Sequence, residues 1–244
     1  MRTKKHSSRK ADEAPTATSV STKIFSSLSK NDFKAIKFTP RQLEFFKMIK
    51  KNDVTLCVGD AGTAKTFVAC YAALDLLREG VQTKIILSRP AVESGENLGF
   101  LPGTLSEKIA PYMKSFLSNM EKIVSHETLQ ALIAKKVLQM EPLAYMRGET
   151  YDDAVMVLDE AQNSDLRQLM LFVTRMGRNS KVIICGDVTQ WDIESRKKDL
   201  LTFSDKIAKG VEGCSMFTFE RADIVRNPLL IKLTDNYESF KRPE

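Results

Sequence analysis

A segment rich in small residues, GDAGTAKT (Gly59–Thr66), constrains this chain more than any other part of it. It directly follows the apolar run VTLCV (54–58) and precedes a helical pattern from about Lys65 to Arg78, which Gly80 ends. Small residues let backbone N–H groups turn toward a bound anion, and the N-terminus of a helix adds its partial positive charge. The segment therefore predicts a phosphate-binding turn between a buried strand and a helix.

This turn matches the pattern G-x-x-x-x-G-K-[ST] except at the position before the lysine, where the chain has Ala64. The pattern predicts that Lys65 reaches the β- and γ-phosphates of ATP and that the Thr66 hydroxyl ligates Mg²⁺. If Ala64 needs a positive φ, alanine costs about 1 kcal/mol, or up to about tenfold in affinity. If φ is negative, the cost is close to zero. The predicted cradle for ATP comprises Gly59, Asp60, Ala61, Gly62, Thr63, Ala64, Lys65 and Thr66.

The segment VMVLDEAQN (155–163) supplies two carboxylates at the end of another apolar run. Asp159 would hold Mg²⁺, together with Thr66, through the water shell of the ion. Glu160 would orient and deprotonate an attacking water molecule, a role worth about 10²–10⁴ in rate. This second carboxylate favours hydrolysis over transfer of the phosphoryl group to an acceptor.

Two glutamines are weaker candidates for the same site. Gln190, in CGDVTQ (185–190), follows a further apolar run together with Asp187, and both would face the γ-phosphate if that strand ends beside the first two. Gln42 lies at the start of the helix before the first strand, where its amide could pair with adenine. The alternatives are an ordinary turn at 186–190 and an exposed polar residue at 42.

The order of the expected elements predicts the fold class. Continuously apolar runs at 54–58, 84–88, 154–158 and 181–185 alternate with helical patterns, and a late strand at 216–219 precedes a final helix at about 228–240. Such runs are typical of a parallel sheet covered on both faces. We therefore expect a doubly wound α/β fold.

The segment at about 104–140 reads as a helical insertion, with apolar residues spaced along one helix face. These residues either pack in the core or form an oligomer contact. They are Leu105, Ile109, Tyr112, Phe116 and Met120.

The charge distribution sets residues 1–37 apart from residues 38–244, the expected ATPase domain. Residues 1–41 hold ten Lys or Arg and three Asp or Glu, so they account for the net charge of +6. We expect residues 1–37 to be a disordered basic arm, either a solvated tail or a site for single-stranded RNA or DNA. The absence of a long apolar run and of an apolar signal segment predicts a cytoplasmic chain without membrane association. Four cysteines without ligand spacing predict buried thiols, not a metal site.

The sequence resembles the PhoH-like ATPases. The resemblance covers about residues 39–240, and its most specific blocks are SRPAVESGENLGFLPGTLSEKIAPYM (88–113) and the region 142–190. It implies a single RecA-like P-loop NTPase lobe, similar to the first lobe of superfamily 1 helicases. On that pattern Gln42 reads adenine, Gln190 is a γ-phosphate sensor, and Arg89 lies in a family block without an assigned role.

The resemblance also implies ring-like homo-oligomers, with a hexamer as one form. In such a ring Arg226, in DIVRNP (223–228), could reach the γ-phosphate of a neighbouring subunit, whereas the alternative is an ion pair or a surface arginine. We expect an ATPase that acts on or with nucleic acid as a helicase-like or remodelling enzyme. The alternatives are a nucleotide-binding switch or scaffold with little turnover and a small-molecule kinase.

Overall fold

A computed structural model describes residues 28–90, 114–187 and 197–225, together with Leu229, residues 231–233, Asn236 and Phe240. Its centre is a six-stranded sheet in the order β3-β2-β4-β5-β1-β6, in which every pair of neighbouring strands is parallel. The strands are β1 (Val54–Val58), β2 (Lys84–Ser88), β3 (Leu138–Met140), β4 (Ala154–Leu158), β5 (Lys181–Gly186) and β6 (Cys214–Thr218). This sheet confirms the expected parallel arrangement.

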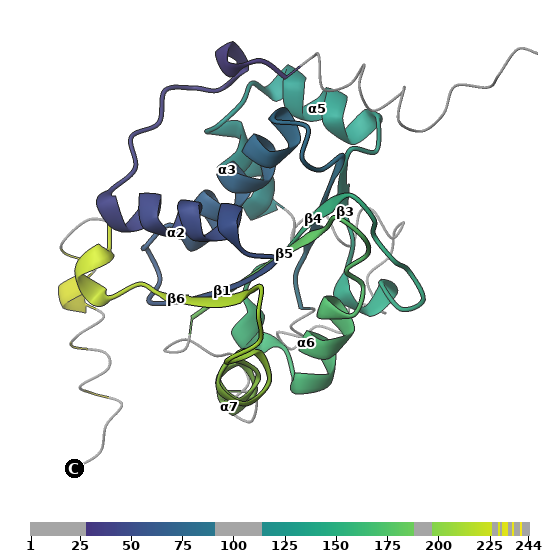
Figure 1. Ribbon diagram of the computed structural model, residues 1–244. Coiled ribbons are helices and arrows are strands. Elements are labelled where there is room, and N and C mark those ends of the chain that lie inside the picture. The colour runs from purple at the N-terminus through teal and green to yellow at the C-terminus, as the bar shows by residue number, and fades with distance from the viewer. Residues whose placement is uncertain are drawn as a thin grey trace, which may run out of the picture.

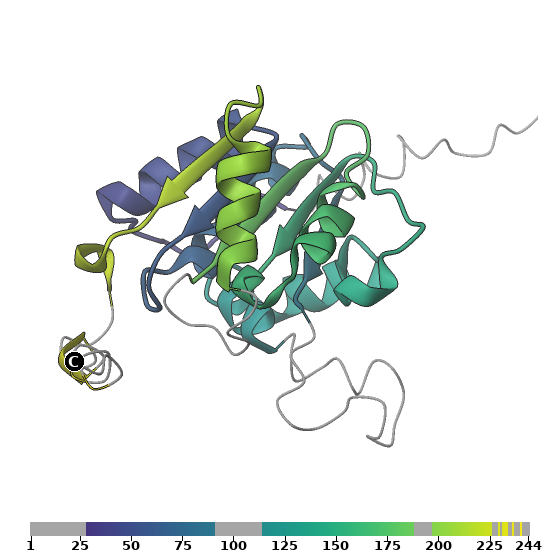
Figure 2. The ribbon, with the colours of Figure 1, turned by 90° about the horizontal axis from the view of Figure 1, so that it is seen from below.

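Helices cover both faces of the sheet (Figure 1). One face carries α2 (Pro40–Lys51), α3 (Lys65–Arg78) and α5 (His126–Ala134), and the other carries α6 (Leu166–Val173) and α7 (Lys197–Thr202), which continues into the π-helical segment η6 (Phe203–Ala208). Figure 2 shows α6 and α7 in front of the sheet from the second side. Each face has its own apolar core, so that along β1 Cys57 joins one core and Leu56 the other. The fold is therefore the expected doubly wound α/β fold, with a parallel sheet covered on both faces.

Local sequence signals account for the starts of two helices. Thr39 caps α2, since its side chain accepts a hydrogen bond from the Gln42 amide while the Gln42 side chain accepts one from the Thr39 amide. Pro40 occupies the first helical position, where its missing N–H costs nothing. Asp165 and Gln168 cap α6 in the same reciprocal way. Short 3₁₀ turns complete the described elements: η1 (Lys30–Asp32), η3 (Leu143–Tyr145), η4 (Ala161–Asn163) and η7 (Arg221–Asp223).

The folded part of the chain begins earlier than the predicted arm boundary at residue 37. Residues 1–27 of the predicted arm lie outside the described residues, but Leu28 is buried, and Phe33 and Ile36 pack against the core. The ring of Phe33 meets Tyr71 of α3 edge to face, with centroids 5.6 Å apart. The Ser- and Lys-rich composition did not predict this packing, because in the described residues 28–37 just three apolar side chains, Leu28, Phe33 and Ile36, contribute to it.

The predicted helical insertion at 104–140 is partly wrong. Residues 114–121 are helical and α5 follows, but residues 138–140 form β3, which pairs with β2 through Leu138 and Ile85. A strand this short shows no period of its own, so it cannot be separated from a helical pattern by sequence. Phe116 and Met120 are buried in the core of the same chain, which supports the core alternative for them. Leu105, Ile109 and Tyr112 lie outside the described residues.

Three further findings bear on the sequence predictions. The helix α7 was not predicted, and of the predicted final helix at 228–240 the described residues are helical, whereas the others lie outside the described part of the chain. The four cysteines are free thiols, three of them buried. Among the helices that the structure describes, none combines the length and the apolar character needed to cross a membrane.

Candidate functional site

The phosphate-binding turn predicted at 59–66 joins the carboxyl end of β1 to the first residue of α3. Its backbone passes through positive φ at Gly59, Gly62 and Ala64, with values of 155°, 94° and 70°. The Thr63 hydroxyl is buried and donates to the carbonyl of Asp60 at 2.9 Å, which closes the turn on itself. Ala64 is the N-cap of α3 and has no side chain that could accept from the first amides of the helix. These amides are therefore available to an anion.

Lys65 folds back over this turn. Its Nζ donates to the carbonyl of Gly59 at 2.7 Å and to that of Asp60 at 2.9 Å. An ammonium group has three donors, so the side chain can exchange these carbonyls for phosphate oxygens. The position fits the predicted role of Lys65.

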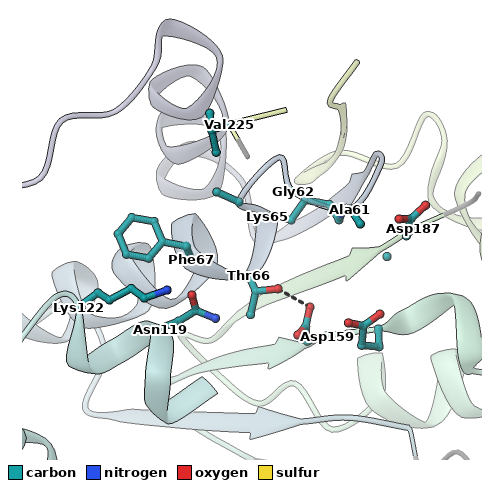
Figure 3. A pocket seen from close by; sticks show the side chains of 13 residues that line it. Ala61, Gly62, Lys65, Thr66, Phe67, Asn119, Lys122, Asp159, Asp187 and Val225 are labelled. Atoms are coloured by element: carbon teal, nitrogen blue, oxygen red, sulfur yellow. Dashed lines mark hydrogen bonds between the residues drawn. The ribbon is translucent and has the colours of Figure 1, made fainter. Parts of the chain in front are cut away.

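The Thr66 hydroxyl meets the carboxylate of Asp159. Thr66 Oγ1 donates to Asp159 Oδ1 at 2.7 Å, an interaction between the first turn of α3 and the end of β4 (Figure 3). Asp159 is only 2% exposed. Two hard oxygen donors that converge beside a phosphate-binding turn fit Mg²⁺, which takes few protein ligands and keeps several waters. In the part of the chain that the structure describes, no group of three or more His, Cys, Asp or Glu forms an alternative metal site.

Glu160 follows Asp159 in a left-handed backbone conformation, with φ of 56°. Its side chain is 47% exposed at the cavity, and Oε2 accepts a hydrogen bond from Gln162 Nε2 at 2.7 Å. Desolvation and the nearby Asp159 charge raise the pKa of Glu160, against the opposing effects of Gln162, Arg89 and Lys65. A carboxyl whose pKa is raised is a better proton acceptor from water.

Gln162 was not singled out in the sequence, although it lies within the predicted DEAQN segment. Its Oε1 accepts from the backbone amide of Asp187 at 2.9 Å, while its Nε2 holds Glu160. One amide side chain thus joins the end of β4 to the end of β5. The sequence feature that could have identified Gln162 is its place as a polar residue shortly after a buried strand.

Arg89, which the sequence left without a role, lies beside the two carboxylates. Because Ser88 pairs with Leu158 in the sheet, the next residues of the two strands, Arg89 and Asp159, are neighbours. One guanidinium nitrogen of Arg89 is 2.5 Å from Asp159 Oδ2 and 3.6 Å from Glu160 Oε1. The available signal was a charged residue at the end of a parallel strand.

Lys65, Thr66, Asp159 and Glu160, together with Ala61, Gly62 and Ala64 of the predicted cradle, line one cavity of about 420 Å³. Figure 3 shows Asn119 and Lys122 on the far side of Thr66 from Asp187, at the opposite end of this cavity. Neither Asn119 nor Lys122 was predicted, because both come from the segment just before α5, which carries no motif of its own. The lining comprises Ala61, Gly62, Ala64, Lys65, Thr66, Phe67, Asn119, Lys122, Asp159, Glu160, Gly186, Asp187 and Val225.

Six predicted site residues are not among the residues that line this cavity. Gly59, Asp60 and Thr63 belong to the phosphate-binding turn but not to the lining. Gln42 is buried and is not among the lining residues, and its side-chain oxygen is engaged in the cap of α2. Gln190 and Arg226 lie outside the described residues. Their roles stay predictions.

The chain after β6 is attached to the phosphate-binding turn. The amide of Phe219 donates to the carbonyl of Val58 at 2.8 Å, and the amide of Val225 donates to the carbonyl of Gly62 at 3.0 Å. A Cβ at Gly59 would lie 2.7 Å from Cβ of Phe219, so glycine is required there by packing as well as by its φ. Both ends of the segment 219–225 are thus bonded to the turn or to the strand residue just before it.

Comparison with solved structures finds remote likenesses. The large terminase of a thermophilic bacteriophage aligns with 85% of this chain and 51% of its own, at 11% identity and a TM-score of 0.48. The Pif1 helicase from Candida albicans aligns with 86% of this chain and 46% of its own, at 17% identity and a TM-score of 0.45.

Comparison with curated proteins finds much closer relatives. The PhoH-like protein of Bacillus subtilis is 42% identical over 82% of this chain and 63% of its own length, and that of Synechocystis is 41% identical over 82% and 61%. Protein PhoH of Escherichia coli is 34% identical over 77% and 54%. The chain spans less than two thirds of the length of each of these relatives. The family described as PhoH-like protein matches residues 35–238, and the chain therefore belongs to that family.

Proposed function

We propose that this chain binds Mg-ATP in the cavity at the carboxyl ends of β1, β4 and β5 and hydrolyses it to ADP and phosphate. The observation that carries this proposal is the convergence of Lys65, Thr66, Asp159 and Glu160 on one cavity. The four residues come from two segments far apart in the sequence. Each has the chemistry that one part of phosphoryl transfer to water requires.

Nucleotide binding is assigned to the turn and the start of α3. Backbone amides of the turn and the first helical turn would surround the β- and γ-phosphates, and Lys65 would replace its two carbonyl partners with phosphate oxygens. Thr66 and Asp159 would hold Mg²⁺, which neutralises charge on the phosphate oxygens when it is bound.

Water activation is assigned to Glu160. Its carboxyl faces the cavity and is oriented by Gln162, so that it can accept a proton from a water molecule placed in line with the γ-phosphate. A kinase has little use for an exposed carboxylate of raised pKa beside the phosphates, because water is the nucleophile it must exclude. Hydrolysis is therefore favoured over transfer to an acceptor.

Association with nucleic acid and assembly into rings are the finer parts of the proposal. The described residues form one lobe, whereas helicase motors close two lobes on the nucleotide, and we propose a neighbouring subunit as the source of the second surface. Arg226 and the basic residues before Leu28 are the candidates for contacts to the nucleotide in trans and to single-stranded RNA or DNA. Turnover per chain that falls on dilution and rises with single-stranded nucleic acid would support this part, and turnover indifferent to both would refute it.

The central test is the variant Lys65→Ala. We expect this variant to lose both binding of a fluorescent ATP analogue and phosphate release. The reason is that the Lys65 ammonium is proposed to contact the phosphates in the bound nucleotide and in the transition state of hydrolysis. Lys84→Ala is the matched control, because Lys84 begins β2 at the opposite end of the sheet. Unchanged binding and turnover in Lys65→Ala would contradict the proposal, while binding with negligible turnover in the unmodified chain would favour a nucleotide switch.

A further inference from the structure

The guanidinium of Arg89 lies beside Asp159, the carboxylate that is proposed to hold Mg²⁺. Asp159 Oδ1 accepts from Thr66, and Oδ2 is 2.5 Å from the guanidinium of Arg89. Both oxygens of the carboxylate are therefore engaged. The guanidinium also lies 3.6 Å from Glu160 Oε1, so one positive charge is shared by two neighbouring acids.

The surroundings of Arg89 hold it in this place. Its guanidinium carbon lies 5.3 Å from the ring centroid of Phe116, a fully buried residue of the helical segment 114–121. The face of an aromatic ring attracts a guanidinium, and the N–H groups at the edge of the guanidinium stay directed to other partners. The side chain of Arg89 is mostly buried, so the ion pair is shielded from the solvent that weakens surface pairs.

A divalent cation ligated by Thr66 and Asp159 would have the guanidinium as a neighbour of like charge. Either the ion or Arg89 can have the full interaction with Asp159 Oδ2, because a bound cation and its water shell need the space and the negative charge that Arg89 now uses. The two interactions are thus mutually weakening. Reciprocity requires that what weakens one binding event weakens the other equally.

We infer that Arg89 is a positioning residue whose guanidinium competes with a divalent cation for Asp159, and that cation binding must displace this guanidinium from Oδ2. This inference rests on the proposed function. If it holds, Arg89 lowers the affinity of the site for Mg²⁺ and raises the stability of the protein when Mg²⁺ is not bound. Removal of the guanidinium should therefore strengthen the dependence of folding stability on Mg²⁺.

The chain contains a matched pair for comparison. Arg78 lies 2.5 Å from Oδ1 of the buried Asp75, the same distance as in the pair of Arg89 and Asp159, and it is equally exposed. This second pair lies near the end of α3, and neither member lines the cavity. Arg78→Met thus reproduces the loss of a buried ion pair without touching the proposed site.

The experiment compares the full chain with Arg89→Met and Arg78→Met. Binding of a fluorescent ADP analogue is measured across a Mg²⁺ titration, and melting temperatures are measured with and without millimolar Mg²⁺ alone. We expect Arg89→Met to reach half-maximal binding at about tenfold lower Mg²⁺ than the unmodified chain. Without Mg²⁺, we also expect both variants to have lower melting temperatures than the unmodified chain. Mg²⁺ should raise the melting temperature of Arg89→Met toward that of the unmodified chain, but not that of Arg78→Met.

Two results would overturn the inference. Equal Mg²⁺ dependence in Arg89→Met and the unmodified chain would show that the pair does not compete with the cation. A higher Mg²⁺ requirement in the variant would show that Arg89 prepares Asp159 for the cation. If Arg89→Met does not fold, Arg89→Lys takes its place, with the same two results as criteria and a smaller expected shift. Failure of every protein to bind the analogue at any Mg²⁺ concentration would contradict the proposed function instead.

Discussion

Two buried aspartates of this fold, Asp75 and Asp159, each pair with an arginine but differ in the partner of their second carboxylate oxygen and in the charges around the pair. Each has an arginine nitrogen 2.5 Å from one carboxylate oxygen. Asp75 lies near the end of α3 and is 6% exposed, and Asp159 lies after β4.

Around Asp75 the charges balance. Lys50 is 2.8 Å from its second oxygen, and Glu79 contacts both Lys50 and Arg78. Two cations and two anions therefore close the cluster. Around Asp159, by contrast, Glu160 shares the same arginine. A buried carboxylate whose two oxygens both meet cations stabilises the fold, whereas Asp159, whose oxygens meet one hydroxyl and one arginine shared with Glu160, has affinity left for a further cation.

The largest effect should follow from Glu160→Gln, which removes the carboxyl that is proposed to accept a proton. We expect ATP turnover to fall by about 10²–10⁴ with nucleotide affinity retained. Phosphate release and binding of the fluorescent analogue are the two measurements. Glu79→Gln in the balanced cluster is the control and should keep full turnover. Equal turnover in both variants would remove the functional difference between the two clusters.

The next effect should follow from Asp75→Ala, which opens the balanced cluster. Breaking a buried ion pair costs about 3–5 kcal/mol, and we expect about 2–3 kcal/mol here because Lys50 and Arg78 can turn partly toward solvent. Chemical denaturation gives the loss in the free energy of unfolding. The folded fraction should keep its turnover per chain. A variant of unchanged stability and reduced turnover would reverse the assignment of this cluster.

A smaller effect is expected from Ala64→Gly. Ala64 has φ of 70° in the turn, a conformation that costs an alanine about 1 kcal/mol relative to glycine. The variant should raise nucleotide affinity or unfolding free energy by up to about that amount, or tenfold in affinity. Ala131→Gly, at an exposed position inside α5, should lower stability by about 1 kcal/mol instead. Destabilisation by both substitutions would show that the backbone at residue 64 relaxes.

The smallest effect concerns the pH dependence of the balanced cluster. Desolvation acts to lower the pKa of Lys50, but hydrogen bonds and charges of Asp75 and Glu79 outweigh it and raise the pKa above its ordinary 10.5. A pKa raised in the folded state gives a stabilisation that is complete below the unfolded value and is lost as pH rises through the folded value. The stability difference between the unmodified chain and Lys50→Met should therefore be constant up to about pH 9.5 and shrink above 10.5. Urea denaturation across this range checks the sign, and a difference that grows with pH would contradict it.

Sequence patterns predicted the parts of this fold that depend on local chemistry. The bounds of β1, β2, β4 and α3 agree with the prediction, because buried parallel strands are continuously apolar and the turn at Gly59–Thr66 fixes where α3 begins. The short β3 at the sheet edge was missed, since its pairing with β2 and not its own pattern makes it a strand.

The same distinction applies to the candidate site. Lys65, Thr66, Asp159 and Glu160 were found from their motifs, and the structure brings them to one cavity. Arg89 and Gln162 received no role, because their contacts depend on the register of β2 against β4 and on the proximity of the ends of β4 and β5. The φ of Ala64 was left open in the sequence and is positive in the structure.

The two hydrogen bonds that fasten the segment 219–225 beside the phosphate-binding turn have a mechanical consequence. Val225 is bonded to Gly62 and Phe219 packs against Gly59, so the turn cannot change shape without pulling on the chain that leads to the carboxyl terminus. A displacement of the turn on phosphate binding would therefore be transmitted directly to residues 219–225 through these hydrogen-bonded peptide groups.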